Sequence, residues 1–198
     1  MLRMVGILLW FFPAFAQAGA QMYEPLSASV KAGLHIEVSD KAISYQKFIS
    51  VFGSKEQGVA WLSAMSKRLE KRMPDPEERN EFLMTVYYEA RRASLDPQLI
   101  LGIIQVESGF KKYAVSKAGA YGYMQVMPFW RKLIGDPSHN LFHRRINLRY
   151  GCTILRHYLD IEKGNYFRAL GRYNGSLGKA AYPNLVKNAW HGNWAYSS

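Results

Sequence analysis

The sequence predicts a mainly α-helical protein, and three observations support this. Apolar residues recur at helical spacing from residue 55 onward, and no convincing strand-type alternation follows that point. A helix-start signal occurs twice, at Asp75-Pro76 and at Asp96-Pro97. Asp is a preferred N-cap residue, and Pro is favoured at the first helical position. A chain of 198 residues suggests a single domain with an N-terminal extension.

The same patterns give the order of the elements. The first clear helix has Val59, Leu62, Met65 and Leu69 on one face and ends before Pro74. Two helices then follow the two Asp-Pro signals. Residues 21–54 have a mixed pattern that fits either a short strand or a helix. We expect helices in the ranges 55–73, 75–94, 96–110, 125–134, 147–162, 165–173 and 182–191.

The first twenty residues have the pattern of a cleavable signal peptide. Arg3 precedes an apolar segment at 4–12, and small residues allow cleavage after Ala18 or Ala20. The alternative is a membrane anchor. A span needs about 20 apolar residues, whereas this segment is short and is interrupted by Pro13. We therefore expect export to the periplasm, with no stable membrane insertion after cleavage.

These segments give a domain plan. We predict a signal peptide at 1–20, a partly helical extension at 21–74, and a compact helical domain at 75–198. The extension could pack on the domain.

The composition limits the partners and the chemistry. The net charge is +11, and loss of Arg3 with the signal peptide leaves +10. A basic protein could bind nucleic acid, anionic lipid or an acidic wall polymer, and export disfavours nucleic acid. Cys152 is the only cysteine, so no intrachain disulfide can form, and its apolar surroundings favour a buried side chain over a nucleophile. The five histidines are scattered, and no zinc-type spacing is present, so we expect no metal site.

Glu107 is the main candidate for chemistry. It ends the apolar run 99–106, which suits a buried helix. A carboxyl at the mouth of an apolar pocket has a raised pKa and can donate a proton near neutral pH. A glycosidic oxygen needs such a proton in order to leave. The alternative is an exposed Glu at a helix end, and it would be preferred if Glu107 stood alone.

The residues around Glu107 favour the chemical interpretation. Ser108 could bond a substrate group, glycines such as Gly122 permit close approach to the backbone, and Tyr121 and Tyr123 could stack on sugar rings. Gln125 offers both a donor and an acceptor. Tyr173 and Asn174 follow at the end of another expected helix.

The segments "ESGF", "AVSKAGAYGYMQVMP" and "RYNGS" together resemble the catalytic core of the soluble-lytic-transglycosylase-like (SLT) family, within the lysozyme-like superfamily. The resemblance covers roughly residues 80–190 and implies a lysozyme-like catalytic domain. It implies that Glu107 is the general acid and base and that Ser108 positions the sugar. It further implies that the glycan groove is lined by Gly122, Met124, Gln125, Tyr173 and Asn174. Tyr123 stands where the family usually has Leu, and Arg172 where it usually has Ala.

The resemblance also implies a reaction. The bond between N-acetylmuramic acid and N-acetylglucosamine in peptidoglycan would be cleaved without water, leaving a 1,6-anhydro end, and no cofactor would be needed. The next acid, Asp136, stands in a "GDPSHN" turn and is expected to serve that turn. We expect Tyr182 and Trp190 to pack in the core, with a place in the glycan groove as the alternative.

Two other functions remain open at this point. One is a lysozyme-type hydrolase, and the other is a wall-binding module without activity. The sequence also leaves open whether the protein serves general wall turnover or opens the wall for a secretion or conjugation machine.

Overall fold

The computed structural model describes residue 21 and residues 42–197, and the expected signal peptide lies outside this part. The described residues contain no β-strand, only two isolated bridges, at 115 with 121 and at 121 with 126. The mainly helical fold expected from the sequence is therefore confirmed. The helices are α2 (Tyr45–Ile49), α3 (Lys55–Leu69), α4 (Pro76–Arg92), α5 (Pro97–Glu107), α6 (Trp130–Ile134), α7 (Arg144–Ile161), α8 (Tyr166–Asn174), α9 (Ala181–Asn188) and the π-helix η1 (Ala189–Asn193).

Both Asp-Pro signals start helices, as the sequence predicted. Oδ1 of Asp75 accepts from the backbone N–H of Glu78 at 2.7 Å, and Oδ1 of Asp96 accepts from that of Gln98 at 2.8 Å. The prolines occupy the first turn, where a missing N–H removes no helical bond. These caps fix where α4 and α5 begin, and the α5 cap therefore also fixes where Glu107 lies at the other end.

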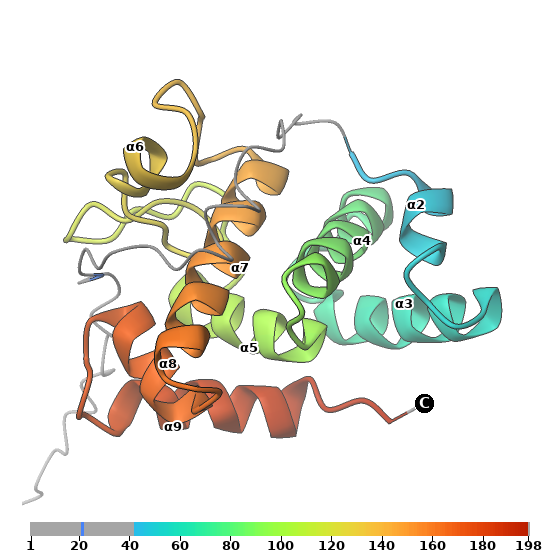
Figure 1. The fold of residues 1–198 in the computed structure, drawn as a ribbon. Coiled ribbons are helices and arrows are strands. Elements are labelled where there is room, and N and C mark those ends of the chain that lie inside the picture. Colours follow the sequence, from blue (N-terminus) through green and yellow to red (C-terminus); the bar gives the residue numbers. More distant parts are fainter. Residues whose placement is uncertain (1–20, 22–41, 198) are drawn as a thin grey trace, which may run out of the picture.

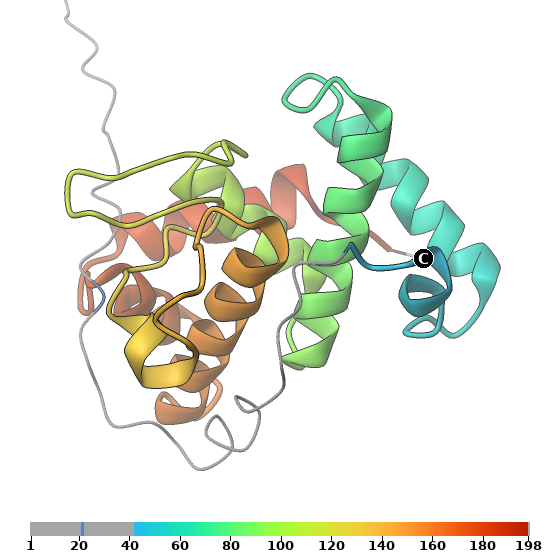
Figure 2. The same cartoon turned by 90° about the horizontal axis from the view of Figure 1, so that it is seen from above.

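Helix α5 lies in the middle of the molecule (Figures 1 and 2). It packs against α4 on one side and against α9 and η1 on the other. Helix α7 packs against both α4 and α8. The side chains of Leu99, Ile100, Ile103 and Ile104 are fully buried. A helix buried in this way is stabilised mainly by tertiary packing, and not by helix propensity alone.

Helix α3 belongs to the same hydrophobic core as the rest of the molecule. Its Trp61, Met65 and Leu69 are buried, and α3 packs on α4. The extension therefore packs on the domain from residue 42 onward. Its expected boundary at residue 74 stays a prediction.

Two expected helices begin three or more residues away from the expected start. The helix expected at 125–134 begins only at Trp130, because Gln125 adopts a left-handed backbone (φ 48°) and Pro128 disfavours a helical residue before it. Helix α7 begins three residues earlier than expected, at Arg144. Arg144 pairs with Glu81 and Arg145 with Glu89 on α4, and these ion pairs hold the additional turn.

A buried group of charges joins α4 to α7. Glu89 is fully buried, and its carboxylate pairs with Arg92 on its own helix and with Arg145 and Arg149 on α7. The two arginines of α7 are four residues apart and so lie on one face of that helix. The sequence analysis did not anticipate this cluster.

In the part of the chain that the structure describes, every helix is too short or too polar to cross a membrane.

Candidate active site

Glu107 is the last residue of α5. Ser108 follows as the C-cap, and Gly109 then turns the chain with a left-handed backbone (φ 57°). This turn leads into the long loop before α6, which runs back past the end of α5 (Figure 2). The apolar helix thus ends by presenting one acid beside a polar loop.

The two carboxyl oxygens of Glu107 have different surroundings. Oε1 accepts a hydrogen bond from the Tyr182 hydroxyl at 2.6 Å. Oε2 is shielded from solvent and has no hydrogen-bond partner among the described residues, although the residue as a whole is only partly buried. Burial raises the pKa of Glu107 to about 8, against a smaller lowering by the Tyr182 hydroxyl. The acid is therefore mainly protonated at neutral pH, as the sequence predicted.

Tyr182 was expected to pack in the core, with a place in the glycan groove as the alternative. It is buried as expected, but its hydroxyl also contacts the candidate acid directly. Nothing near Tyr182 in the sequence signals this contact, because it depends on the packing of α9 against α5. Trp190 lies at the other end of α5, where its Nε1 donates to Oδ2 of Asp96 at 2.7 Å.

Tyr173 also lies near Glu107. It is fully buried, and its hydroxyl donates to the backbone oxygen of Met124 at 2.8 Å. Its pKa lies well above the usual range, first because of burial and next because of the Glu107 carboxyl nearby. Asn174 ends α8 and is almost fully buried, just before the left-handed Gly175 (φ 74°). The end of α8 therefore reaches the same region as the end of α5.

Ser108 and Gln125 hold the loop together. Oγ of Ser108 lies 2.8 Å from the backbone oxygen of Tyr123 and 3.2 Å from that of Ile104. Nε2 of Gln125 donates to the oxygens of Gly122 at 2.8 Å and Ala114 at 3.2 Å. Because the donors of both side chains are used within the protein, a ligand could engage them only through their oxygens.

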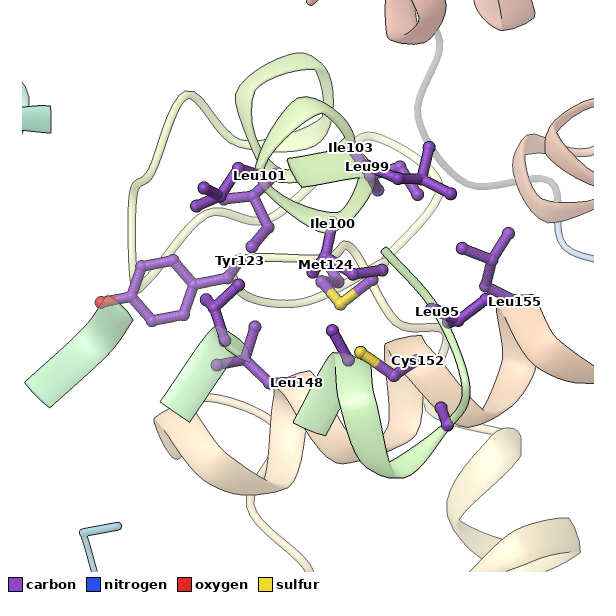
Figure 3. Close-up of a cluster of buried hydrophobic side chains, with 14 of the residues drawn as sticks. Leu95, Leu99, Ile100, Leu101, Ile103, Tyr123, Met124, Leu148, Cys152 and Leu155 are labelled. Atoms are coloured by element: carbon purple, nitrogen blue, oxygen red, sulfur yellow. The ribbon is translucent and has the colours of Figure 1, made fainter. Parts of the chain in front are cut away.

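Tyr123 and Met124 are core residues, as Figure 3 shows. The Tyr123 ring packs 4.8 Å from that of Phe82, and burial raises its pKa to about 12. The structure therefore corrects the expectation that Tyr123 stacks on a sugar, because its ring has no free face. The Met124 side chain packs so closely on Gly151 that a Cβ there would lie 2.3 Å from its sulfur. Met124 is fully buried, so the structure does not place its side chain in a glycan groove.

Gly122 is needed for close approach, but the approaching group is a protein side chain. A Cβ at Gly122, which has φ 75°, would lie 2.5 Å from Nδ2 of Asn147 and 2.8 Å from the Leu141 oxygen. Asn147 accepts from the Met124 N–H and donates to the oxygens of Tyr121 and Leu141, each at 2.8 Å. Asn147 is thus a supporting residue that sequence reasoning missed.

Gln21 is a second residue that the sequence analysis missed. Its side chain is buried in the loop, although it is more than a hundred residues away in the chain. Its Oε1 accepts from Trp130 Nε1 at 2.8 Å and from the Met127 N–H at 3.3 Å, and its Nε2 donates to the Gln125 oxygen at 3.3 Å. One side chain therefore fixes both sides of Pro128.

Two further expectations are confirmed. Oδ1 of Asp136 accepts from the N–H and the hydroxyl of Ser138, at 2.8 and 2.7 Å, and these bonds lower the pKa of Asp136. It is a turn residue, as expected. Cys152 is buried, which raises the pKa of its thiol. Among the residues described, no three His, Cys, Asp or Glu side chains are grouped so that they could hold a metal ion.

Comparison with known proteins gives consistent matches. The family model "Transglycosylase SLT domain" matches residues 84–189, just over half of the chain. The transglycosylase of Enterobacteria phage PRD1 is 33% identical over 109 residues, covering 52% of this chain and 38% of its own length. Membrane-bound lytic murein transglycosylase C of Mannheimia succiniciproducens is 50% identical over 99 residues, covering 46% of this chain and 27% of its own length.

A solved structure of an inactive mutant of the lytic transglycosylase Slt from Pseudomonas aeruginosa is 22% identical, with a TM-score of 0.43. The match covers 71% of this chain and 26% of that one. This chain thus spans well under half the length of the relatives that it matches.

Proposed function

Because the chain belongs to the transglycosylase SLT domain family, we propose that it is a peptidoglycan lytic transglycosylase. It cleaves the β-1,4 glycosidic bond between N-acetylmuramic acid and N-acetylglucosamine. The observation that carries the proposal is the Glu107 carboxyl, whose pKa burial raises to about 8 and which has one oxygen without a partner among the described residues. A general acid needs a pKa near the working pH, and a pKa of about 8 meets that need.

In the first step Glu107 gives its proton to the glycosidic oxygen. The bond from that oxygen to the anomeric carbon of N-acetylmuramic acid breaks, and N-acetylglucosamine leaves with the proton on its new hydroxyl. The Tyr182 hydroxyl donates to Oε1, so the acidic proton belongs on Oε2. Once the proton has left, the hydrogen bond from Tyr182 stabilises the new carboxylate, because bonds to charged acceptors are stronger. Oε2 is covered, so an incoming sugar must displace the groups over it and at the same time exclude water.

In the second step the substrate closes on itself. Its N-acetyl group stabilises the positive charge at the anomeric carbon, and its 6-hydroxyl attacks that carbon. Glu107 takes the hydroxyl proton, which restores the neutral acid and leaves a 1,6-anhydro end. The pKa of Glu107 is set by burial and Tyr182, with no contribution from another carboxylate among the described residues. A mechanism with one protein acid fits this site better than a two-carboxylate hydrolysis.

The other predicted site residues support this acid. Ser108, Gln125 and Tyr173 hold the loop and the backbone of Met124 in place next to it. The oxygens of Ser108, Gln125 and Asn174 are our candidates for substrate contact. For stacking on sugar rings we keep Tyr121, whose ring centroid lies 5.1 Å from that of Phe142. In place of Tyr123 we propose Tyr113, which is 70% exposed.

We further propose that the protein works on glycan strands in the periplasm, after removal of residues 1–20. The basic mature chain suits a wall polymer whose peptides carry carboxylates, and no nucleic acid is involved. The catalytic unit is taken as 75–198, with the extension packed on it.

Mass spectrometry of the products tests the proposal. Digestion of purified sacculi is expected to give muropeptides that end in 1,6-anhydro-N-acetylmuramic acid and are one water lighter than hydrolysis products. Products with reducing ends would instead indicate a lysozyme-type hydrolase. No products, with sacculus binding equal in wild type and Glu107→Gln, would indicate a wall-binding module.

A further inference from the structure

A cavity of about 450 Å³ lies away from Glu107, where the α2–α3 connection, the end of α4, the start of α5 and the C-terminal segment meet. Pro97 and Gln98 line it, and Glu107 ends the same helix of 11 residues. The two places are therefore roughly 15 Å apart at 1.5 Å per residue. The volume lies within the range of small-ligand sites, about 300–1,000 Å³.

Three aromatic rings form one wall of this cavity. The rings of Phe52 and Tyr87 are stacked, with their centroids 4.0 Å apart and their planes at 15°. Trp61 meets Tyr87 edge-on at 4.7 Å. Such a wall offers a flat surface to the apolar part of a ligand, and its rigid side chains lose little entropy on binding.

Side chains of both charges line the cavity beside this aromatic wall. The pKa of Tyr87 is raised mainly by burial, and it also responds to the positive charge of Arg91 and the negative charge of Asp96. Both charges therefore lie close to one phenol. Arg91 is exposed and makes no ion pair with any residue in the range 42–197. Asp96 is held in place by the Gln98 N–H and by Nε1 of Trp190.

Ser94 lines the same cavity in a conformation that does not favour it. Its φ is 54°, the left-handed position after a helix where glycine is the usual residue. Backbone strain of this kind is concentrated at functional sites. At this position serine keeps a hydroxyl at the cavity that glycine would not supply.

We propose that this cavity binds the zwitterionic amino-acid end of a peptidoglycan stem peptide, with the carboxylate on Arg91 and the ammonium on Asp96. The carbon chain that leads from this end to the rest of the peptide lies on the Phe52–Tyr87 wall. A purely anionic ligand would face Asp96 and a neutral sugar would leave both charges unused, so a ligand with both charges fits best. The identity of the peptide rests on the proposed function. The cavity would hold a peptide of the same wall whose glycan is cut at Glu107.

Calorimetry with the full chain tests this binding. The probe is the stem tetrapeptide L-Ala–γ-D-Glu–meso-diaminopimelyl–D-Ala, with its alanine amino group acetylated. Its diaminopimelyl residue keeps a free amino group and a free carboxylate on one carbon. We expect it to bind, and we expect Arg91→Gln to weaken binding about tenfold or more, because charged hydrogen bonds are lost. Lys67→Gln removes an equal charge from an exposed position on α3 outside the cavity and is expected to change nothing.

A second peptide tests the zwitterion. Acetylation of the diaminopimelyl amino group as well is expected to abolish the interaction with Asp96 and to weaken binding about tenfold or more. Ser94→Gly keeps the backbone conformation and removes the hydroxyl, so it tests the cavity without risk to folding and should weaken binding by a smaller factor.

The outcomes separate this proposal from the proposed function. Glu107→Gln is expected to bind the peptide as the wild type does, because it lies outside the cavity. Equal binding by wild type and Arg91→Gln, equal binding of both peptides, or no binding at all would overturn the proposal. If sacculi yield no cleaved products while the peptide still binds through Arg91, the enzymatic function fails and the peptide site stands.

Discussion

Two buried glutamates in this molecule have opposite surroundings. Glu89 on α4 is fully buried and is paired with Arg92, Arg145 and Arg149. Glu107 at the end of α5 has a single protein partner among the described residues, the neutral hydroxyl of Tyr182. Burial disfavours a lone charge, whereas paired cations stabilise it. Glu89 therefore serves structure, while Glu107 keeps its proton and can give it away.

The difference shows how one residue type acquires two roles. Three arginines around one carboxylate fix α7 against α4, and the desolvation of these charges is offset only when all partners are in place. Around Glu107 no cation among the described residues lowers its pKa, and burial raises that pKa to about 8. The proton can then be transferred near neutral pH, and the partner missing on Oε2 is the one that a substrate would provide.

The largest effect is expected at the unpaired acid. In Glu107→Gln the amide cannot donate or accept the transferred proton, so cleavage of sacculi should fall by about 10²–10⁴-fold or more. Release of soluble muropeptides measures this fall. Glu70→Gln, at an exposed position after α3, is the matched control and should keep full activity. Turnover near the wild-type rate in Glu107→Gln would remove this residue from the mechanism.

The paired acid should show its effect in stability. Glu89→Gln leaves three arginines without their carboxylate, and breaking a buried ion pair from one side typically lowers the free energy of unfolding by about 3–5 kcal/mol. Urea unfolding at pH 7 measures this loss. Glu81→Gln removes a more exposed partner of Arg144 between the same two helices, and should lower it by less than about 1 kcal/mol. Equal losses in both variants would mean that burial does not determine how much these ion pairs contribute to the free energy of unfolding.

Glu107 should also make the stability of the protein depend on pH. The folded-state pKa of Glu107 is raised from 4.5 to about 8, so folding retains its proton while the unfolded chain releases it. The stability that this provides is complete below pH 4.5 and is lost as the pH rises through 8. A shift of this size corresponds to at most about 5 kcal/mol, and solvent near a partly buried residue reduces it.

Comparison with Glu107→Gln isolates this contribution, because all other groups titrate alike in both proteins. We expect the variant to match the wild type at pH 4 and to be more stable by about 2–3 kcal/mol at pH 8. Urea unfolding at the two pH values measures the difference. A gap that is constant with pH would mean that folding does not raise the pKa of Glu107.

The sequence was most informative where the signals are local. The caps at Asp75 and Asp96 act over three residues, and the helix starts that they predict are correct. Glu107 could be found because it directly follows a continuous apolar run. The raised pKa follows from the same pattern, because burial is its largest cause.

The sequence was less informative where the partners are distant. Tyr182 is 75 residues from Glu107, and Arg149 is 60 residues from Glu89. No spacing rule joins them, because the packing of separate helices brings them together. Tyr123 shows a different limit. A family motif fixes its place in the chain, but only the structure shows that its ring faces the core.

The smallest effect is expected from the partner of the unpaired acid. Tyr182→Phe removes the one hydrogen bond that lowers the pKa of Glu107, so that pKa should rise. Glu107 then becomes a weaker acid, and its carboxylate is less stabilised after proton transfer. At about 1 kcal/mol for the lost bond, the rate at pH 7 should fall less than tenfold.

The pH profile of the rate separates a change in the pKa of Glu107 from a packing defect, because a packing defect would not move the profile. In Tyr182→Phe the fall of kcat/KM on the alkaline side, expected near pH 8 in the wild type, should move to higher pH because it follows the pKa of Glu107. Tyr166→Phe removes the hydroxyl of a partly buried ring on α8, and it should leave the profile unchanged. A lower rate with an unmoved alkaline limb would mean that Tyr182 only fills space, and that Glu107 sets its own pKa by burial alone.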